Sequence, residues 1–156
     1  MNNEGEKRGG PQVPLDPLVD VIAALRQPDG CPWDREQTHT SLRSCLIEEC
    51  YEVVEAIDEN DMNKLKEELG DLLLQIVFHA QMAEEAGVFD LNEVIEGIVK
   101  KMVRRHPHVF GTEKADDSDA VVEKWENIKQ REREQKAEPG GALGRVPLQL
   151  PALMRA

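Results

Sequence analysis

The amino-acid sequence predicts an all-α protein, a bundle of four to five helices. Apolar residues recur at intervals of three and four over long stretches, and little of the chain alternates as β-strands do. Hydrophobic residues make up 40% of the 156 residues and charged residues 32%, as expected of amphipathic helices. A chain of this length can bury one substantial core but is short for two domains.

The first three predicted helices have recognisable limits. Asp16 followed by Pro17 favours a helix start, with Asp16 as the cap, and this helix should stop before Pro28. The second and third predicted helices cover residues 41–59 and 62–85. Residues 27–40 between the first and second helices are expected to form a loop.

Two further helices are predicted in the second half of the chain. Asp90 and Glu93 fit a capping box that opens a helix ending in a basic turn. Ser118 is expected to cap the last helix, and the charged residues 131–138 are expected to fray into solvent.

Composition divides the chain into three parts. Residues 1–14 are expected to be a flexible lead and residues 15–138 the helical domain. Residues 139–156 begin as a Pro/Gly linker.

Charge and cysteine content limit the partners. A formal net charge of -12 argues against binding nucleic-acid polymers or anionic membranes. The three cysteines form no Cys-x-x-Cys pair, so free thiols in a reducing cytoplasm fit best. The polar N-terminus and the lack of a long apolar stretch predict a soluble, cytoplasmic protein.

Two acidic pairs border the apolar faces of the second and third predicted helices. At 100° per residue, Glu49 and Glu52 lie beside the apolar arc of the second helix. Glu68 and Asp71 lie beside the apolar face of the third, a face that includes Leu69, Leu73 and Ile76 and is expected to be its core face. The short link between these helices predicts an antiparallel hairpin, in which the two pairs can meet.

Four carboxylates in one small volume call for a cation. At about 5 Å and an effective dielectric near 20, each like-charge pair costs roughly 3 kcal/mol. A set of oxygen ligands favours Mg²⁺ over zinc, with Mn²⁺ as a possible substitute. The alternative is that these acids are ordinary solvated faces of an acidic protein.

The basic turn near residue 105 has two interpretations. Lys101 and Arg105 fall on the inward face of their helix, where they could grip a polyphosphate. Lys100 and Arg104 face away. Stabilisation of the helix dipole would also explain these cations.

Several segments resemble one known family. Glu48-Glu49-x-x-Glu52 followed by Glu68-x-x-Asp71 resembles the signature of the MazG-type, all-α nucleoside triphosphate pyrophosphohydrolases. Residues 30–34, 68–73 and 104–110 are also similar to MazG sequences, and the resemblance runs from about residue 15 to the end. Within residues 139–156, the segment 147–156 resembles the connector between the two tandem domains of long MazG proteins, which implies that a second domain is absent from this chain.

The resemblance implies an activity and an assembly. Members hydrolyse nucleoside triphosphates, including deoxynucleotides, to a monophosphate and pyrophosphate by attack of water at the α-phosphate, and assemble as dimers or dimers of dimers. Mg²⁺ would be held by the four acids described above, Glu49, Glu52, Glu68 and Asp71. Glu48 could orient or deprotonate the attacking water.

The same resemblance suggests the residues that bind substrate. Lys101 and Arg105 match the family's phosphate-binding helix, with Lys64 as a helper. Trp33 is implied to shape the nucleotide site, although a tryptophan in such a loop is more often a core anchor. Trp125 and Lys129 match positions that close over the nucleotide, and core packing of Trp125 is equally compatible with its sequence.

Two other functional classes fit parts of the pattern. One is a nucleotide-binding or oligomerising module with little turnover that supports a second catalytic domain. The other is a di-iron carboxylate bundle, which is disfavoured because the required Glu-x-x-His repeats are missing.

Overall fold

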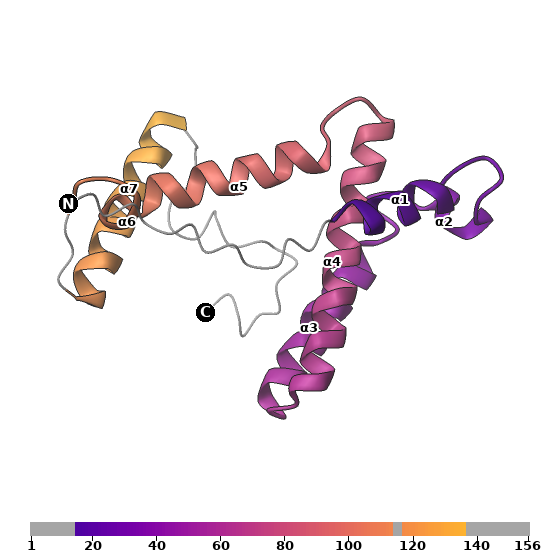
Figure 1. Cartoon of the computed structure of the whole chain (residues 1–156), viewed down its shortest axis with the longest axis horizontal. Coiled ribbons are helices and arrows are strands. Elements are labelled where there is room, and N and C mark those ends of the chain that lie inside the picture. Colours follow the sequence, from indigo (N-terminus) through magenta and orange to yellow (C-terminus); the bar gives the residue numbers. More distant parts are fainter. Residues whose placement is uncertain (1–14, 114–116, 137–156) are drawn as a thin grey trace, which may run out of the picture. The chain divides into compact units, whose positions relative to one another are not determined.

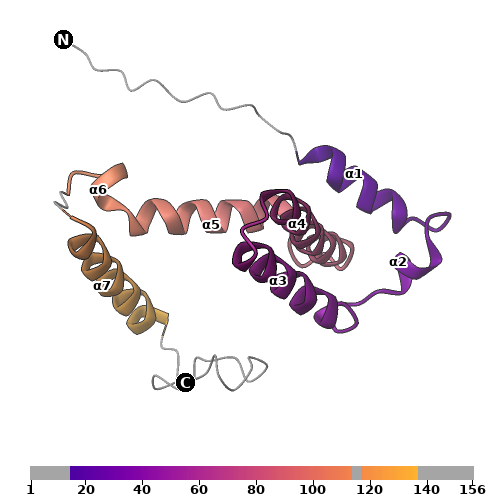
Figure 2. The ribbon, with the colours of Figure 1, turned by 90° about the horizontal axis from the view of Figure 1, so that it is seen from below.

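The computed structural model describes residues 15–113 and 117–136, and every regular element among them is a helix, which confirms the all-α prediction. The helices, shown in Figures 1 and 2, are α1 (Asp16–Leu25), α2 (Pro32–Glu36), α3 (Arg43–Asp58), α4 (Met62–Glu85), α5 (Leu91–Arg105), α6 (Pro107–Phe110) and α7 (Ser118–Lys136). The predicted lead at 1–14 and the linker at 139–156 lie outside the described residues.

The chain divides into two compact units, Met1–Glu96 and Gly97–Ala156, with the division inside α5. In the first unit α4 packs against both α3 and α1. Figures 1 and 2 show α3 running beside the first half of α4, as predicted for an antiparallel hairpin.

The turn between α3 and α4 is closed by backbone geometry. Asn60 has a left-handed φ of 56°, its N–H donates to Ile57 O at 3.0 Å, and the Asp61 N–H donates to Ala56 O at 3.0 Å. This is the Schellman pattern, which satisfies the last carbonyls of α3. The Asp61 side chain then caps α4 by accepting from the N–H groups of Asn63 and Lys64, at 2.9 and 3.1 Å.

The core of the first unit lies where α1 and the start of α3 meet the second half of α4. Its buried side chains are Ile22, Leu42, Val77, Phe78 and Met82. The sequence assigned the core of α4 to a face that includes Leu69, Leu73 and Ile76, and this is wrong for the chain by itself. Those three side chains are exposed, because α1 covers the Phe78 side instead.

The predicted loop at residues 27–40 contains the short helix α2, which the sequence analysis missed. Arg26 holds this segment in place. Its Nη1 donates to Asp34 O at 2.5 Å, while Nε and Nη2 donate to the Glu85 carboxylate at 2.7 to 3.0 Å. The guanidinium also lies 5.4 Å from the centroid of the Phe78 ring, so one side chain ties α1, α2 and α4 together.

The predicted helix caps are partly correct. Asp90 and Glu93 form the expected capping box, with each backbone N–H donating to the other's carboxylate at 3.1 and 2.8 Å. Asp16 is not a cap, since it is already helical and Leu15 precedes α1 without a side-chain bond. At α7 the cap is Asp117 rather than Ser118, because Asp117 Oδ1 accepts from the Ala120 N–H at 2.8 Å.

In the second unit, α7 extends further than predicted. Residues 131–136 are helical rather than frayed, because Glu132 bonds to arginines of α5. The face of α5 predicted to point inward is partly exposed, with Ile98 at 47% and Val99 at 52%. Within the described residues, no helix has the length and apolarity needed to cross a bilayer.

Replacing Arg26 by alanine is expected to lower the free energy of unfolding by about 2 kcal/mol, because a nearly buried cation and its bonds to two helices are lost. Chemical denaturation measures this change. Arg35→Ala is the matched control, since Arg35 donates to Pro28 O in the same segment but is exposed. Equal losses for the two variants would contradict the role given to Arg26.

Candidate metal centre

Three carboxylates meet between α3 and α4. Glu49 of α3 and Glu68 and Asp71 of α4 each offer an oxygen, and these oxygens all lie within 4.8 Å of one another. Glu49 and Glu68 are half-buried and Asp71 is exposed. The sequence expectation that acids from the two helices meet is therefore confirmed for these three residues.

Glu52 lies beside this cluster without belonging to the group of three. Burial, followed by the charges of Asp71 and Glu52, raises the pKa of Glu49 above the ordinary carboxylate value. Burial and the charge of Glu52, followed by that of Asp71, likewise raise the pKa of Glu68. The charges of Glu52 and Asp71 thus add to burial in making Glu49 and Glu68 harder to ionise.

The donor set fits a hard divalent cation. Among the described residues, this is the one group of three or more possible metal ligands, and it contains no imidazole or thiolate. Carboxylate oxygens suit Mg²⁺ or Mn²⁺, whereas structural zinc sites usually include Cys or His. A divalent charge would also offset the repulsion that, after burial, raises the pKa values of Glu49 and Glu68.

Lys64 is directed mainly to the far end of α3. Its ammonium lies 2.6 Å from Glu55 Oε2 and 3.1 Å from Glu59 Oε2. Hydrogen bonds to these two carboxylates raise the pKa of Lys64, so it stays charged. The structure therefore gives Lys64 two acidic partners outside the cluster of three.

Lys101 and Arg105 lie in the second unit, whereas the acidic cluster lies in the first. Lys101 is exposed, and Arg105 is half-buried against Glu132, with Nη2 2.7 Å from Oε2. Binding of a substrate phosphate by these two cations therefore stays a prediction.

Comparison with known proteins places the chain in a family. Residues 37–110 match the MazG nucleotide pyrophosphohydrolase domain. The crystal structure of a mazG-related protein from Thermotoga maritima superposes with a TM-score of 0.61 and 31% identity, covering 74% of this chain and 98% of that one. The chain belongs to the MazG family.

Two curated relatives are more similar in sequence to this chain than the protein of that crystal structure is. The nucleoside triphosphate pyrophosphohydrolase of Escherichia coli (strain K12) is 50% identical over 143 residues, which cover 91% of this chain and 54% of the relative. The nucleoside triphosphate pyrophosphohydrolase/pyrophosphatase MazG of Thermotoga maritima is 48% identical over 142 residues, covering 91% and 53%. The chain thus spans about half the length of these relatives.

The two tryptophans of this MazG family member differ in their surroundings. Trp33 is 59% exposed, so its interpretation as a core anchor is wrong, because α2 carries the ring outward. Trp125 is half-buried, with Lys129 Nζ 5.0 Å from its ring centroid and Arg105 Cζ 6.0 Å away. Binding of nucleotide by Trp33, Trp125 and Lys129 stays a prediction.

Sequence reasoning missed several long-range partners. His79 Nδ1 pairs with Nδ1 of His39 at 2.8 Å, a contact that the sequence analysis did not predict. Glu132 was assigned to a frayed end, yet its hydrogen bonds to Arg105 and Arg104 lower its pKa to about 2. These partners are 27 to 40 residues apart, and no local pattern marks them.

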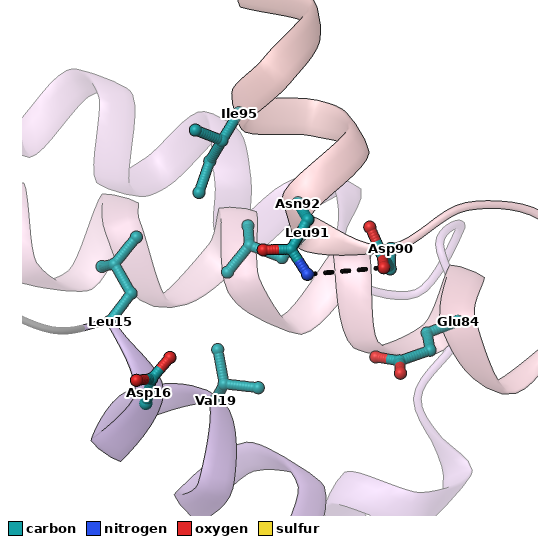
Figure 3. Close-up of a pocket in the computed structure, with 8 residues that line it drawn as sticks. All are labelled: Leu15, Asp16, Val19, Glu84, Asp90, Leu91, Asn92 and Ile95. Atoms are coloured by element: carbon teal, nitrogen blue, oxygen red, sulfur yellow. Dashed lines mark hydrogen bonds between the residues drawn. The ribbon is translucent and has the colours of Figure 1, made fainter.

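A pocket of about 400 Å³ lies where the start of α1 faces the end of α4 and the start of α5 (Figure 3), and none of the three clustered acids lines it. It is lined by Leu15, Asp16, Val19, Glu84, Asp90, Leu91, Asn92 and Ile95. Three carboxylates and no cation line it, so it is unsuited to a triphosphate. The acidic cluster is the better candidate site.

Glu49→Gln is expected to raise the melting temperature of the metal-free protein at pH 7. The folded-state pKa of Glu49 is raised, so the stability associated with its protonated form is present at low pH and is lost as pH rises through that pKa. Removing the charge restores this stability, and the difference in melting temperature should vanish below the ordinary carboxylate pKa. In excess Mg²⁺ the wild type should melt at a higher temperature than the variant, because the ion stabilises only the wild type.

Calorimetry or fluorescence melting in EDTA and in Mg²⁺ gives the measurement. Glu48→Gln is the matched control, because Glu48 is the adjacent, exposed acid on the same helix. The same rise in both variants would attribute the effect to net charge and contradict a specific cluster.

Proposed function

We propose that this chain hydrolyses nucleoside triphosphates, including deoxynucleotides, to a nucleoside monophosphate and pyrophosphate. The observation that carries the proposal is the meeting of Glu49, Glu68 and Asp71 across the α3–α4 hairpin. Support comes from membership of the MazG family and from relatives named nucleoside triphosphate pyrophosphohydrolases at 48% and 50% identity.

The acids Glu49, Glu52, Glu68 and Asp71 would hold Mg²⁺, with Mn²⁺ as a possible substitute. A bound Mg²⁺ ion supplies Lewis acidity at the α-phosphate and lowers the pKa of water. Burial, and then the charges of Asp71 and Glu52, raise the pKa of Glu49. The repulsion between these acids supports this role, because a divalent charge relieves it.

The reaction exchanges one phosphorus–oxygen bond for another. The oxygen of water forms a bond to the α-phosphorus, and the bond from that phosphorus to the bridging oxygen of the β-phosphate breaks. Glu48, exposed on α3 next to Glu49, would orient the water or accept its proton. Pyrophosphate leaves with the bonding electrons.

Cationic and aromatic side chains would bind the rest of the substrate. Lys101 and Arg105 would hold the β- and γ-phosphates, with Lys64 in support, and the fork of Arg105 suits phosphate oxygens. Trp125 and Lys129, already in cation–π contact, would close over the nucleotide. Trp33, exposed on α2, offers a ring on which a base can stack.

A second candidate function follows from the length of the relatives. Because the chain spans only 54% and 53% of the two relatives above, it could be a nucleotide-binding module for a catalytic partner domain. Pyrophosphate release by this chain from a panel of nucleotides with Mg²⁺ decides between the two. Binding without turnover would favour the module.

We also propose that the chain assembles as a homodimer or a dimer of dimers. Ile47, Tyr51 and Val54 form an exposed apolar stripe on α3, and Leu69, Leu73 and Ile76 form another on α4. Both stripes follow the i, i+4, i+7 spacing of a helix face that packs against another surface. A second copy would bury them.

We expect the protein in the cytoplasm, with no nucleic-acid polymer or membrane as partner. The three cysteines, Cys31, Cys45 and Cys50, are free thiols, which persist in a reducing compartment. The net charge of -12 opposes binding to polyanions.

Glu52→Gln and Asp71→Asn should each lower the Mg²⁺-dependent rate of pyrophosphate release by at least about 100-fold, since each removes a proposed ligand, whose loss should exceed that of an outer-shell partner. Asp58→Asn, at the exposed end of α3, is the control and should leave the rate unchanged. Rates equal to wild type in both site variants would remove the proposed site.

Leu73→Glu should convert the assembly to monomers, because it places a charge in the exposed stripe of α4. Light scattering on the wild type should give a multiple of the chain mass, and the variant should give the chain mass. Val21→Glu is the control, since Val21 is 54% exposed on α1 and lies outside both stripes. A monomeric wild type would refute the assembly.

A further inference from the structure

Two arginines of α5 share one carboxylate of α7. Arg104 Nε and Nη2 both lie 2.6 Å from Oε1 of Glu132. Arg105 Nη2 and Nε lie 2.7 and 3.2 Å from Oε2. Each oxygen is therefore held by a separate guanidinium, and all of these residues belong to the second unit.

Cationic charge is in excess at this place. Two guanidiniums face one carboxylate. A third cation, Lys129, lies nearby, with its Nζ 5.0 Å from the centroid of the Trp125 ring and 2.6 Å from Glu126 Oε1. The Arg105 and Glu132 side chains are 17% and 16% exposed, whereas Arg104 is 54% exposed. The Arg105–Glu132 ion pair is thus partly shielded from solvent, whereas Arg104 is open to it.

This geometry suits an anion larger than a carboxylate. Arginine forks bind phosphate through paired N–H donors, and two forks match the several oxygens of a phosphate better than the two of a glutamate. A phosphate also carries more charge, which would balance both guanidiniums.

We propose that Arg104 and Arg105 form a phosphate-binding site that Glu132 occupies from within, and that the terminal phosphate of the nucleotide displaces Glu132 when it binds. The choice of a nucleotide phosphate rests on the proposed function. Arg104, which the sequence analysis placed facing away, becomes part of the site, and Glu132 becomes an internal competitor.

The competitor remains charged at neutral pH. Hydrogen bonds to Arg105 and Arg104 hold the pKa of Glu132 at about 2, far below physiological pH. Release therefore depends on a competing anion rather than on protonation.

The first test measures the affinity of the full chain for inorganic pyrophosphate in EDTA by calorimetry. Glu132→Gln should tighten binding by about fivefold, since the competing ion pair is lost while the side-chain size is kept. Glu134→Gln is the matched control, because Glu134 is an exposed acid of α7 that accepts from Gln130 on the same helix. It should change affinity less than twofold.

Other outcomes overturn the proposal. Equal gains in the two variants would show an effect of net charge alone. Weaker binding in a folded Glu132→Gln protein would show that Glu132 braces the arginines rather than competing for them. Absence of pyrophosphate binding in all proteins would remove the site.

A second measurement covers the case in which Glu132→Gln fails to fold. In the wild type, NMR signals of the arginine Nε–Hε groups and of the Glu132 carboxyl carbon are followed during pyrophosphate titration. The signals of Arg104, Arg105 and Glu132 should shift together. Unchanged signals at saturation would overturn the proposal.

The experiments separate this inference from the proposed hydrolysis, because neither requires turnover or a divalent ion. Pyrophosphate that displaces Glu132 from a chain without hydrolytic activity would refute the hydrolysis and leave the phosphate site. An active chain in which Glu132 never moves would support the hydrolysis and refute the phosphate site.

Discussion

Repulsion between carboxylates is the constraint on which the first unit depends. Glu49, Glu68 and Asp71 place oxygens within 4.8 Å of one another, and burial and proximity raise the pKa of Glu49 and Glu68. The acids themselves disfavour this arrangement, and the packing of α3 on α4 imposes it. A cation that binds there offsets the repulsion that the packing of α3 on α4 imposes. Its affinity is therefore linked to the stability of the fold.

The second unit shows the opposite imbalance. Two arginines converge on the single carboxylate of Glu132, so positive charge is in excess around α5 and α7. The charge distribution of the whole chain, acidic by -12, is thus uneven in a way that net charge alone conceals.

Local signals allowed the sequence to predict the hairpin and its acids. The limits of α4 follow from the turn at Asn60 and Asp61 and from an unbroken helical period. Periodicity does not say what covers an apolar face, so Leu69 was assigned to the core although α1 covers the Phe78 side. Pairing of Glu132 with Arg104, 28 residues away, leaves no trace in local sequence.

The left-handed turn at Asn60 has a consequence for chain length. Two backbone hydrogen bonds close a short turn between the two helices. The positions of the acids along each helix are therefore fixed relative to this turn. Adding one residue would rotate one helix by about 100° relative to the other and turn its acidic pair away. The number of residues between the two motifs is therefore as important to the candidate metal centre as the acids themselves.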